Sequence, residues 1–474
     1  MRKVVIFIIV LLGVFLRGWG LGNKGLWLDE TISFHYADPF HRTFLSLIRE
    51  VREVDAHPPF YYLLLHGWLL PLKKIYKDRL IIAPCEVVRE GYLRFPSFLF
   101  ASLSIFMFWL VERELKGKGW GTLLFSLSSY HIYYAQEARL YSLVVLFSLL
   151  SLFFLLRAEN MPLYWIPLTL IWCFALYTYI FFLFFIIALD IWWWFEKKRK
   201  FLPWFLSHVF LILSFLPYLP FVIRRLMTLP TFPVKVSLKQ KILSFISVPL
   251  NFSLGEVLPF PLSLKILLFL LILFFLFFPF FTSFTRREKL PLFGFFIPFF
   301  LLPFLPYRSH IFNPKFLIFS FPCVFLIFSL SLEKMRKEGR WLLIALLVIG
   351  NAVSFSLYRM PSLQKERWRE CTEWVVLREK EKEIVIFNPP YVGYAFDFYY
   401  RGKLERRGFI HDSSLQDIEK FSGVFLIENL SPVAFPSSKP SQLLKKDFLP
   451  VEAEIFQGYI GLIRVSLWRR KDLK

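Results

Sequence analysis

Long apolar segments recur over the first 357 residues of the chain and are separated by short clusters of basic residues. An apolar segment of about 20 residues is long enough to cross the hydrocarbon core of a bilayer as a helix. The sequence therefore predicts a polytopic α-helical membrane protein with about eleven membrane-spanning helices. They are expected near residues 4–22, 92–112, 119–136, 139–156, 162–178, 179–195, 202–223, 262–283, 290–306, 316–332 and 340–357.

The formal net charge of +22 is spread over the connections between these segments rather than gathered in one polar domain. This distribution favours membrane lipid head groups and phosphates as partners and does not indicate a nucleic acid. The first apolar segment has no small-residue cleavage site, so we expect it to be retained as a span.

Short basic connections are typical of the cytoplasmic side of a membrane. Placing them there requires that residues 58–72 do not cross, and at 1.5 Å of rise per residue this segment reaches only roughly 22 Å. We therefore expect it to be a juxtamembrane helix in a long external loop, 23–91. The connections used for this assignment are 112–119, 157–160, 196–200, 285–289 and 333–340.

Two domains are expected from this pattern, a transmembrane domain over 1–357 and an external, periplasmic-side α/β domain over 358–474. The second has strand-like runs at 382–388, 423–429 and 459–470, an amphipathic helical pattern in "SLQKERWRECTEWVVLREK" and a loop at 431–442. It carries no cofactor motif, which favours a docking or lid role. The expected location is the plasma (inner) membrane, with the active site on the external face.

The segment "LWLDETISFHYA" places Asp29 and Glu30 just beyond the first span. Carboxylates at an apolar interface are costly unless they are paired or used. In one interpretation the pair caps a helix N-terminus. In the other, Asp29 is a general base.

The segment "DAHPPFYY" holds Asp55 and His57 in a defined place, because Pro58 and Pro59 fix an extended chain before the short helix. A surface histidine often has no special role; here a contact with substrate or metal is an equal alternative. A divalent metal remains possible as a cofactor, with candidate ligands Asp29, Glu30, Asp55 and His57, although no spacing establishes it.

Further charged residues are expected at the external ends of spans. Arg94, Glu137 and Arg139 are either lipid-contacting arginines and a local ion pair or parts of an anion-binding set. The segment "LPYRSHIFNPKFLIF" adds donors suited to a phosphate, namely Arg308, His310, Asn313 and Lys315.

The order of these motifs, "WLDETISFHYA", "HPPFYYLLLHGW", "LRFPSFLF", "YYAQEARLYSL" and "NPKF", resembles the family 39 membrane glycosyltransferases of the GT-C fold. That group includes the protein O-mannosyltransferases and, more distantly, the lipid A aminoarabinose transferases. The resemblance covers about residues 1–360. It implies an enzyme that moves a hexose or pentose from a polyprenyl-phosphate donor to a protein, lipid or glycan acceptor.

The resemblance also implies roles for single residues. Asp29, with Glu30 beside it, matches the family's catalytic acidic residue, and His57 matches the start of the juxtamembrane helix. The residues that match donor- or substrate-binding positions are Arg94, Glu137, Arg139 and, where relatives often carry Pro-Arg-Tyr, Lys315 of Pro-Lys-Phe. A second departure is "LYTYI" at 176–180, where many relatives have His-Tyr.

The chemistry agrees with such a site, because an acceptor hydroxyl needs a base whereas a phosphate leaves without a proton. One carboxylate then suffices, and the anomeric centre is inverted. Two alternatives stay open: a lipid-linked saccharide transporter and an oligosaccharide ligase or polymerase. A transporter usually buries its charges near mid-span, whereas the candidates here are expected at external ends.

Overall fold

The computed structural model describes residues 3–55, 57–76, 83–195, 201–228, 238–302, 313–430 and 437–471, and every structural statement below refers to these ranges. The chain forms two compact units. The helical unit comprises Met1–Trp19, Thr43–Leu64 and Phe95–Tyr358, and the α/β unit comprises Gly20–Arg42, Leu65–Arg94 and Arg359–Lys474.

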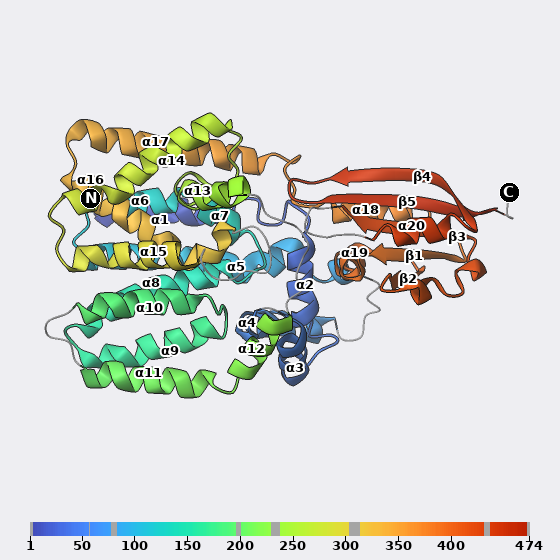
Figure 1. Ribbon diagram of the computed structural model, residues 1–474, viewed down its shortest axis with the longest axis horizontal. Coiled ribbons are helices and arrows are strands. Elements are labelled where there is room, and N and C mark those ends of the chain that lie inside the picture. Colours follow the sequence, from blue (N-terminus) through green and yellow to red (C-terminus); the bar gives the residue numbers. More distant parts are fainter. Residues whose placement is uncertain are drawn as a thin grey trace. The chain divides into compact units, whose positions relative to one another are not determined.

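The helical unit is built from α-helices joined by short connections, and α8, α9, α10, α11 and α15 are drawn nearly parallel in Figure 1. Its α-helices are α1 Lys3–Gly18, α3 Phe44–Val54, α6 Trp120–Ser126, α7 Ser129–Ala135, α8 Tyr141–Ala158, α9 Trp165–Leu176, α10 Phe182–Trp194, α11 Phe201–Phe215, α12 Leu219–Thr228, α13 Leu238–Leu254, α14 Leu262–Phe277, α15 Leu290–Leu301, α16 Phe321–Lys334 and α17 Lys337–Arg359. Short 3₁₀ helices are η2 Pro162–Tyr164, η3 Phe278–Phe281, η4 Arg287–Lys289 and η6 Pro314–Ser320. Helices α4 Phe60–Ile75 and α5 Glu90–Glu114 contribute residues to both units.

The protein is a multi-pass membrane protein, but the expected number of eleven spans is not confirmed. Five helices in the described ranges are long and apolar enough to cross a bilayer, and a sixth results if α11 and α12, bent by 64°, count as one span. The five are Glu90–Glu114, Tyr141–Ala158, Leu262–Phe281, Pro314–Lys334 and Lys337–Arg359. Other apolar segments form helices that are too short, such as α9 and α10 with 12 and 13 residues.

The segment expected as one span at 119–136 is broken between α6 and α7. A break leaves the last carbonyls of the first helix without intrahelical partners. Arg17, a fully buried residue at the end of α1, supplies donors for two of them. Its Nη1 donates to the carbonyl of Ser126 at 2.9 Å and its Nη2 to that of Phe125 at 3.1 Å. Arg17 Nη2 also lies 2.9 Å from Nδ1 of His131 in α7.

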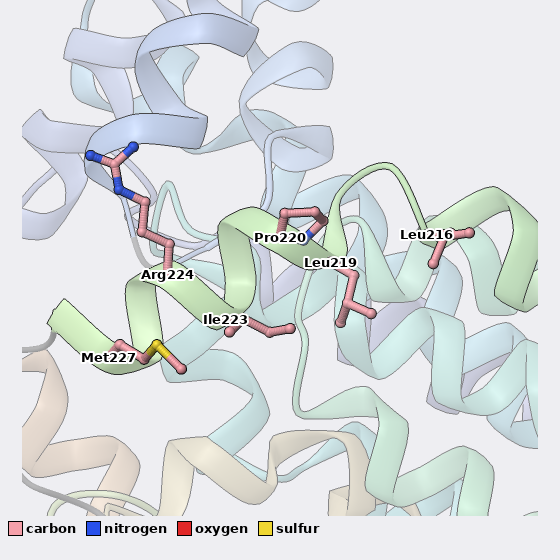
Figure 2. A pocket seen from close by; sticks show the side chains of 6 residues that line it. All are labelled: Leu216, Leu219, Pro220, Ile223, Arg224 and Met227. Carbon is pink, nitrogen blue, oxygen red and sulfur yellow. The ribbon is translucent and has the colours of Figure 1, made fainter.

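A groove of about 520 Å³ lies where α11 bends into α12. Figure 2 shows Ile223 and Met227 on one side of α12 and Arg224 pointing to the other. The remaining lining residues are Leu216, Leu219 and Pro220, so the surface is almost wholly apolar. A helix with one apolar and one basic side is suited to the boundary between lipid and water.

The α/β unit contains a five-stranded mixed sheet in the order β2-β1-β3-β5-β4, visible as arrows in Figure 1. β2, β1 and β3 are parallel, whereas β5 pairs antiparallel with β3 and β4. The strands are β1 Glu383–Asn388, β2 Glu405–Gly408, β3 Gly423–Asn429, β4 Phe448–Gln457 and β5 Leu462–Arg470. The helical elements are α2 Leu28–Ala37, η1 Pro84–Glu86, α18 Trp368–Val376, η7 Pro390–Val392, α19 Gly393–Tyr399, η8 Asp412–Leu415, η9 Ile418–Lys420 and α20 Lys439–Leu444.

The three strands predicted from the sequence correspond to β1, β3 and β5, whose inward side chains, such as Ile384, Leu426 and Trp468, form one buried cluster. The predicted helix over 362–380 is shorter, Trp368–Val376. The predicted loop at 431–442 is partly wrong, because α20 begins at Lys439, and 431–436 lie outside the described residues. All four cysteines are free thiols.

Candidate functional site

Asp29 and Glu30 lie together in the first turn of α2, but their exposure differs. Glu30 is fully buried, whereas Asp29 is partly exposed. Negative charge near a helix N-terminus is stabilised by the helix dipole. Glu30 Oε2 also accepts a hydrogen bond of 3.4 Å from the backbone N–H of Trp27, so the capping interpretation applies to Glu30.

Glu30 forms a bidentate ion pair with Arg94, which is 4% exposed. The Nε–Oε1 and Nη2–Oε2 distances are both 2.7 Å. The other three N–H groups of Arg94 donate to backbone carbonyls, at 3.1 Å to Leu21, 2.8 Å to Lys24 and 3.0 Å to Gly25. A guanidinium has five N–H groups. All five N–H groups are used within the α/β unit. Arg94 therefore fixes the segment before α2.

A carboxylate that the sequence did not single out also supports this helix. Glu366 Oε2 accepts 2.8 Å and 2.7 Å hydrogen bonds from the backbone N–H of Leu28 and from Nε1 of Trp368. Burial raises the pKa of Glu366, and the negative charge of Asp29 acts in the same direction. Glu366 lies in a segment that sequence alone gave no reason to connect with residue 29. Only the tertiary fold brings the two carboxyl groups into electrostatic range.

Basic residues gather near the same helix start. Lys24 donates to the carbonyl of Leu363 at 3.1 Å, and Lys365 Nζ lies 3.9 Å from the ring centroid of Trp27. Burial, followed by the positive charges of Arg359, Arg94 and Lys365, lowers the pKa of Lys24 to about 8. Lys24 and Lys365 therefore add positive charge near the segment that leads into α2.

The His-Pro-Pro segment belongs to the helical unit. Asp55 Oδ1 accepts from the backbone N–H of His57 at 2.7 Å, and Oδ2 accepts from the hydroxyl of Tyr62 at 3.2 Å. The ring of His57 lies 5.7 Å from that of Tyr179, which stands in "LYTYI", the segment without the relatives' histidine. Helix α4 begins directly afterwards, at Phe60, and is not among the helices able to span a membrane.

Arg139 and Lys315 approach the same aromatic ring from different elements. Arg139 Cζ lies 5.9 Å and Lys315 Nζ 5.8 Å from the ring centroid of Tyr141, the first residue of α8. Lys315 lies in η6, where Asn313 caps the helix by accepting from the backbone N–H of Lys315 at 3.0 Å. The structure thus brings together two cations that the sequence placed 176 residues apart (315 − 139). Arg308 and His310 lie outside the described residues.

The turn that carries Glu137 and Arg139 is held from several sides. Gln136 Nε2 donates to the carbonyls of Arg17 and Trp19, both at 3.0 Å. The hydroxyl of Ser97 donates to the carbonyl of Arg139 at 3.1 Å. Glu137 itself is 3% exposed. These contacts fix the backbone from which both charged side chains project.

The four candidate metal ligands belong to two units: Asp29 and Glu30 to the α/β unit, and Asp55 and His57 to the helical unit. Within the described ranges, no three His, Cys, Asp or Glu side chains gather as a metal-binding group. Both oxygens of Glu30 contact Arg94, and both oxygens of Asp55 accept hydrogen bonds.

Neither a protein-family model nor a curated protein sequence matches the chain. Solved structures do match its fold. ArnT from Cupriavidus metallidurans in the apo state has a TM-score of 0.58 at 11% identity, covering 98% of this chain and 97% of that chain. The same protein bound to undecaprenyl phosphate gives 0.55 at 11% identity, with 98% of each chain covered. AglB from Archaeoglobus fulgidus, in complex with an inhibitory peptide and a dolichol-phosphate, gives 0.53 at 12% identity over 89% of this chain and 69% of that one.

The chain therefore has the GT-C fold, the fold that the order of its motifs predicted. At these identities the likeness shows the fold alone. Within this class, the likeness to ArnT extends over nearly the full length of both chains, the α/β unit included.

Proposed function

We propose that this protein is an integral membrane glycosyltransferase. It transfers a hexose or pentose from a polyprenyl-phosphate donor to a hydroxyl group of a protein, lipid or glycan on the external face of the plasma membrane. The main support is the nearly full-length likeness to ArnT, a protein that also has a structure with undecaprenyl phosphate bound. The apolar groove at the α11–α12 bend offers a surface suited to lipid chains.

In the proposed reaction, Asp29 is the base. The acceptor oxygen bonds to the anomeric carbon, the bond from that carbon to the donor phosphate breaks, and the acceptor proton passes to Asp29. This single displacement inverts the configuration at the anomeric carbon. The partial exposure of Asp29 supports the role, because a base must reach its substrate. Glu30 and Arg94 act as positioning residues, since their charged groups are used by each other.

Arg139 and Lys315 bind the phosphate that departs. Two cations that both lie within 6 Å of the centre of one buried tyrosine ring provide the positive charge that a leaving phosphate requires. His57 and Glu137 are proposed to contact substrate from their own well-held backbone positions. No step in this scheme passes through a metal ion.

The residues before 358 are proposed to form the catalytic domain, with the loop 23–91 supplying Asp29. The segment 358–474 is proposed to serve as a docking module on the external face. Glu366, in the C-terminal segment, supports a link between docking and catalysis, because it accepts a hydrogen bond from the backbone of the helix that carries Asp29.

The test is to incubate the purified protein in nanodiscs with polyprenyl-phosphate sugars and a panel of acceptors, and to measure released polyprenyl phosphate. Asp29→Asn should lower the rate by about 10²–10⁴-fold, the usual effect of losing a general base. Its thermal unfolding should match that of the wild type. Near-normal turnover by Asp29→Asn would exclude Asp29 as the base.

The matched control is Asp38→Asn. Asp38 is the C-cap residue of the same helix and contacts His41 at 2.6 Å. This variant should retain transfer. If no donor releases its phosphate and labelled lipid-linked saccharide instead crosses the bilayer, the transporter alternative is favoured.

A further inference from the structure

A second cavity, of about 550 Å³, lies within the α/β unit. This volume falls in the range of small-molecule sites, about 300–1,000 Å³. The walls are formed by the segment leading into α5, by α18 and by the end of α19. Its lining residues are Cys85, Arg89, Glu90, Arg369, Thr372, Glu373, Val376, Leu377, Tyr399 and Arg401.

Three guanidinium groups face this cavity, and they differ in how they are used. Arg369 is ion-paired with Glu90. Arg401 lies 3.8 Å from a carboxylate oxygen of Glu86, but its side chain is 62% exposed, which makes this a weak surface pair. The side chain of Arg89 is exposed, and its guanidinium has no hydrogen-bond or ionic partner among the residues that the structure describes.

The remaining polar lining is suited to hydroxyl groups. Glu373 presents a carboxylate, which accepts hydrogen bonds from neighbouring sugar hydroxyls. The hydroxyl of Thr372 donates to the backbone of Trp368 at 2.7 Å and keeps lone pairs for a ligand. Val376 and Leu377 add apolar surface. A ligand that places a phosphate at the arginines and hydroxyl groups at Glu373 has the chemistry of a sugar phosphate.

The cavity wall is also connected to the segment before Asp29. The hydroxyl of Tyr399 donates to Glu90 at 3.0 Å and accepts from the backbone N–H of Leu26 at 2.7 Å. Glu90 lies one helical turn before Arg94, which holds Glu30. A ligand that contacts Glu90 or Tyr399 therefore touches groups that hold this segment.

We propose that this cavity is a binding site for a phosphorylated sugar, with Arg89 and Arg401 at the phosphate and Glu373 at the hydroxyls. Two kinds of ligand carry this chemistry: a soluble sugar phosphate and the phosphosugar head group of a membrane lipid. The inference does not depend on the proposed transfer reaction.

Cys85 provides a site-specific measurement, because it lines the cavity and is partly exposed, whereas the other three cysteines are buried. The full-length protein in phosphatidylcholine nanodiscs is alkylated with iodoacetamide, with and without glucose 1-phosphate. At ten times its Kd, the ligand should slow alkylation of Cys85 about ten-fold. Glucose, or sodium chloride at matched ionic strength, should not.

Arg89→Gln should abolish this protection, measured against the alkylation rate of the same variant without ligand. The control is Arg406→Gln, which removes an arginine that pairs with Asp397 at 2.7 Å outside the cavity. This variant should keep full protection. Nanodiscs containing phosphatidylinositol form the membrane arm, and protection there alone assigns the ligand to a lipid. Absence of protection in both arms, or protection that Arg89→Gln retains, overturns the proposal.

Discussion

Arg94 illustrates how one side chain decides local structure. Its five N–H groups join the carboxylate of Glu30 to three carbonyls between residues 21 and 25. Both charged groups are almost completely buried, at 5% and 1% side-chain exposure. Removing one member of a buried ion pair leaves the other charge without compensation.

Arg94→Gln should therefore lower the free energy of unfolding by roughly 3–5 kcal/mol. Thermal and denaturant unfolding of the protein in detergent would measure this loss. Arg406→Gln, which breaks a half-exposed pair, should change stability by less than about 1 kcal/mol. Equal effects of the two substitutions would contradict a special role for the buried pair.

Lys24 should make stability depend on pH. Its pKa is lowered in the folded state from 10.5 to about 8, so folding disfavours the charged form. Between these values the unfolded chain binds more protons than the folded one, and stability must rise with pH. The melting temperature of the wild type relative to Lys24→Met should thus be lowest below pH 8 and should increase toward pH 10.5. A difference independent of pH would rule out this effect.

Sequence reasoning located Asp29 and Glu30 as a pair but could not divide their roles. Adjacent residues in a helix point about 100° apart, so one carboxylate became buried against Arg94 and the other stayed accessible. That division depends on which side of α2 packs against the unit. The contribution of Glu366 was missed because its hydrogen-bond partner, Leu28, is 338 residues away in the sequence.

At the scale of elements, the break between α6 and α7 is supported by Arg17. Its side chain binds the carbonyls that the break exposes, and its own carbonyl accepts from Gln136. α1 therefore contacts both the break and Gln136, the residue that follows α7. The turn at 136–139 begins where α7 ends.

Arg17→Met should destabilise the protein, because an unpaired buried acceptor costs about 1–3 kcal/mol. Arg17→Lys should recover only part of the lost stability, because its ammonium group donates to fewer of these carbonyls than the guanidinium does. Thermal unfolding in detergent is the measurement. Arg157→Met serves as the control, because its pair with Glu114 at 2.6 Å leaves the Arg157 side chain 44% exposed. A fully stable Arg17→Met would show that the carbonyls find other partners.

Element prediction succeeded where apolar periodicity was strong and failed elsewhere. β1 and β3 are buried strands with continuous apolar runs, and in β5 the apolar residues alternate with Arg464 and Ser466. β2 reads "ERRG" and β4 carries acidic residues and a proline, so both were missed. They form only because neighbouring strands offer hydrogen-bonding edges. Helix α13 was also missed, since its polar start resembled part of a loop.

At the scale of the whole molecule, motif order predicted the fold better than hydropathy predicted the number of spans. Hydropathy detects apolar length, but it does not detect where a helix breaks or bends. The segments at 119–136 and 202–223 both turned out to be divided helices. Polar breaks of this kind are tolerated at membrane depth where other protein groups satisfy the backbone.

The expected orientation can be tested by labelling. In a Cys85→Ser background, a cysteine at Lys337, within the basic connection 333–340, should resist an impermeant maleimide added to intact cells. A cysteine at the exposed Lys445 should react, because the C-terminal segment is expected outside. Efficient labelling at residue 337 would reverse the assigned topology. Labelling after permeabilisation checks that both sites are reactive.

The outer strands of the sheet affect how copies of the protein behave when they are crowded together. β4, at one border, is irregular between Pro450 and Glu452, and β2, at the other, is short and charged. Proline, charge and irregular pairing discourage the addition of a foreign strand. Neighbouring copies are therefore poor templates for one another, and the sheet should resist polymerising into intermolecular fibrils.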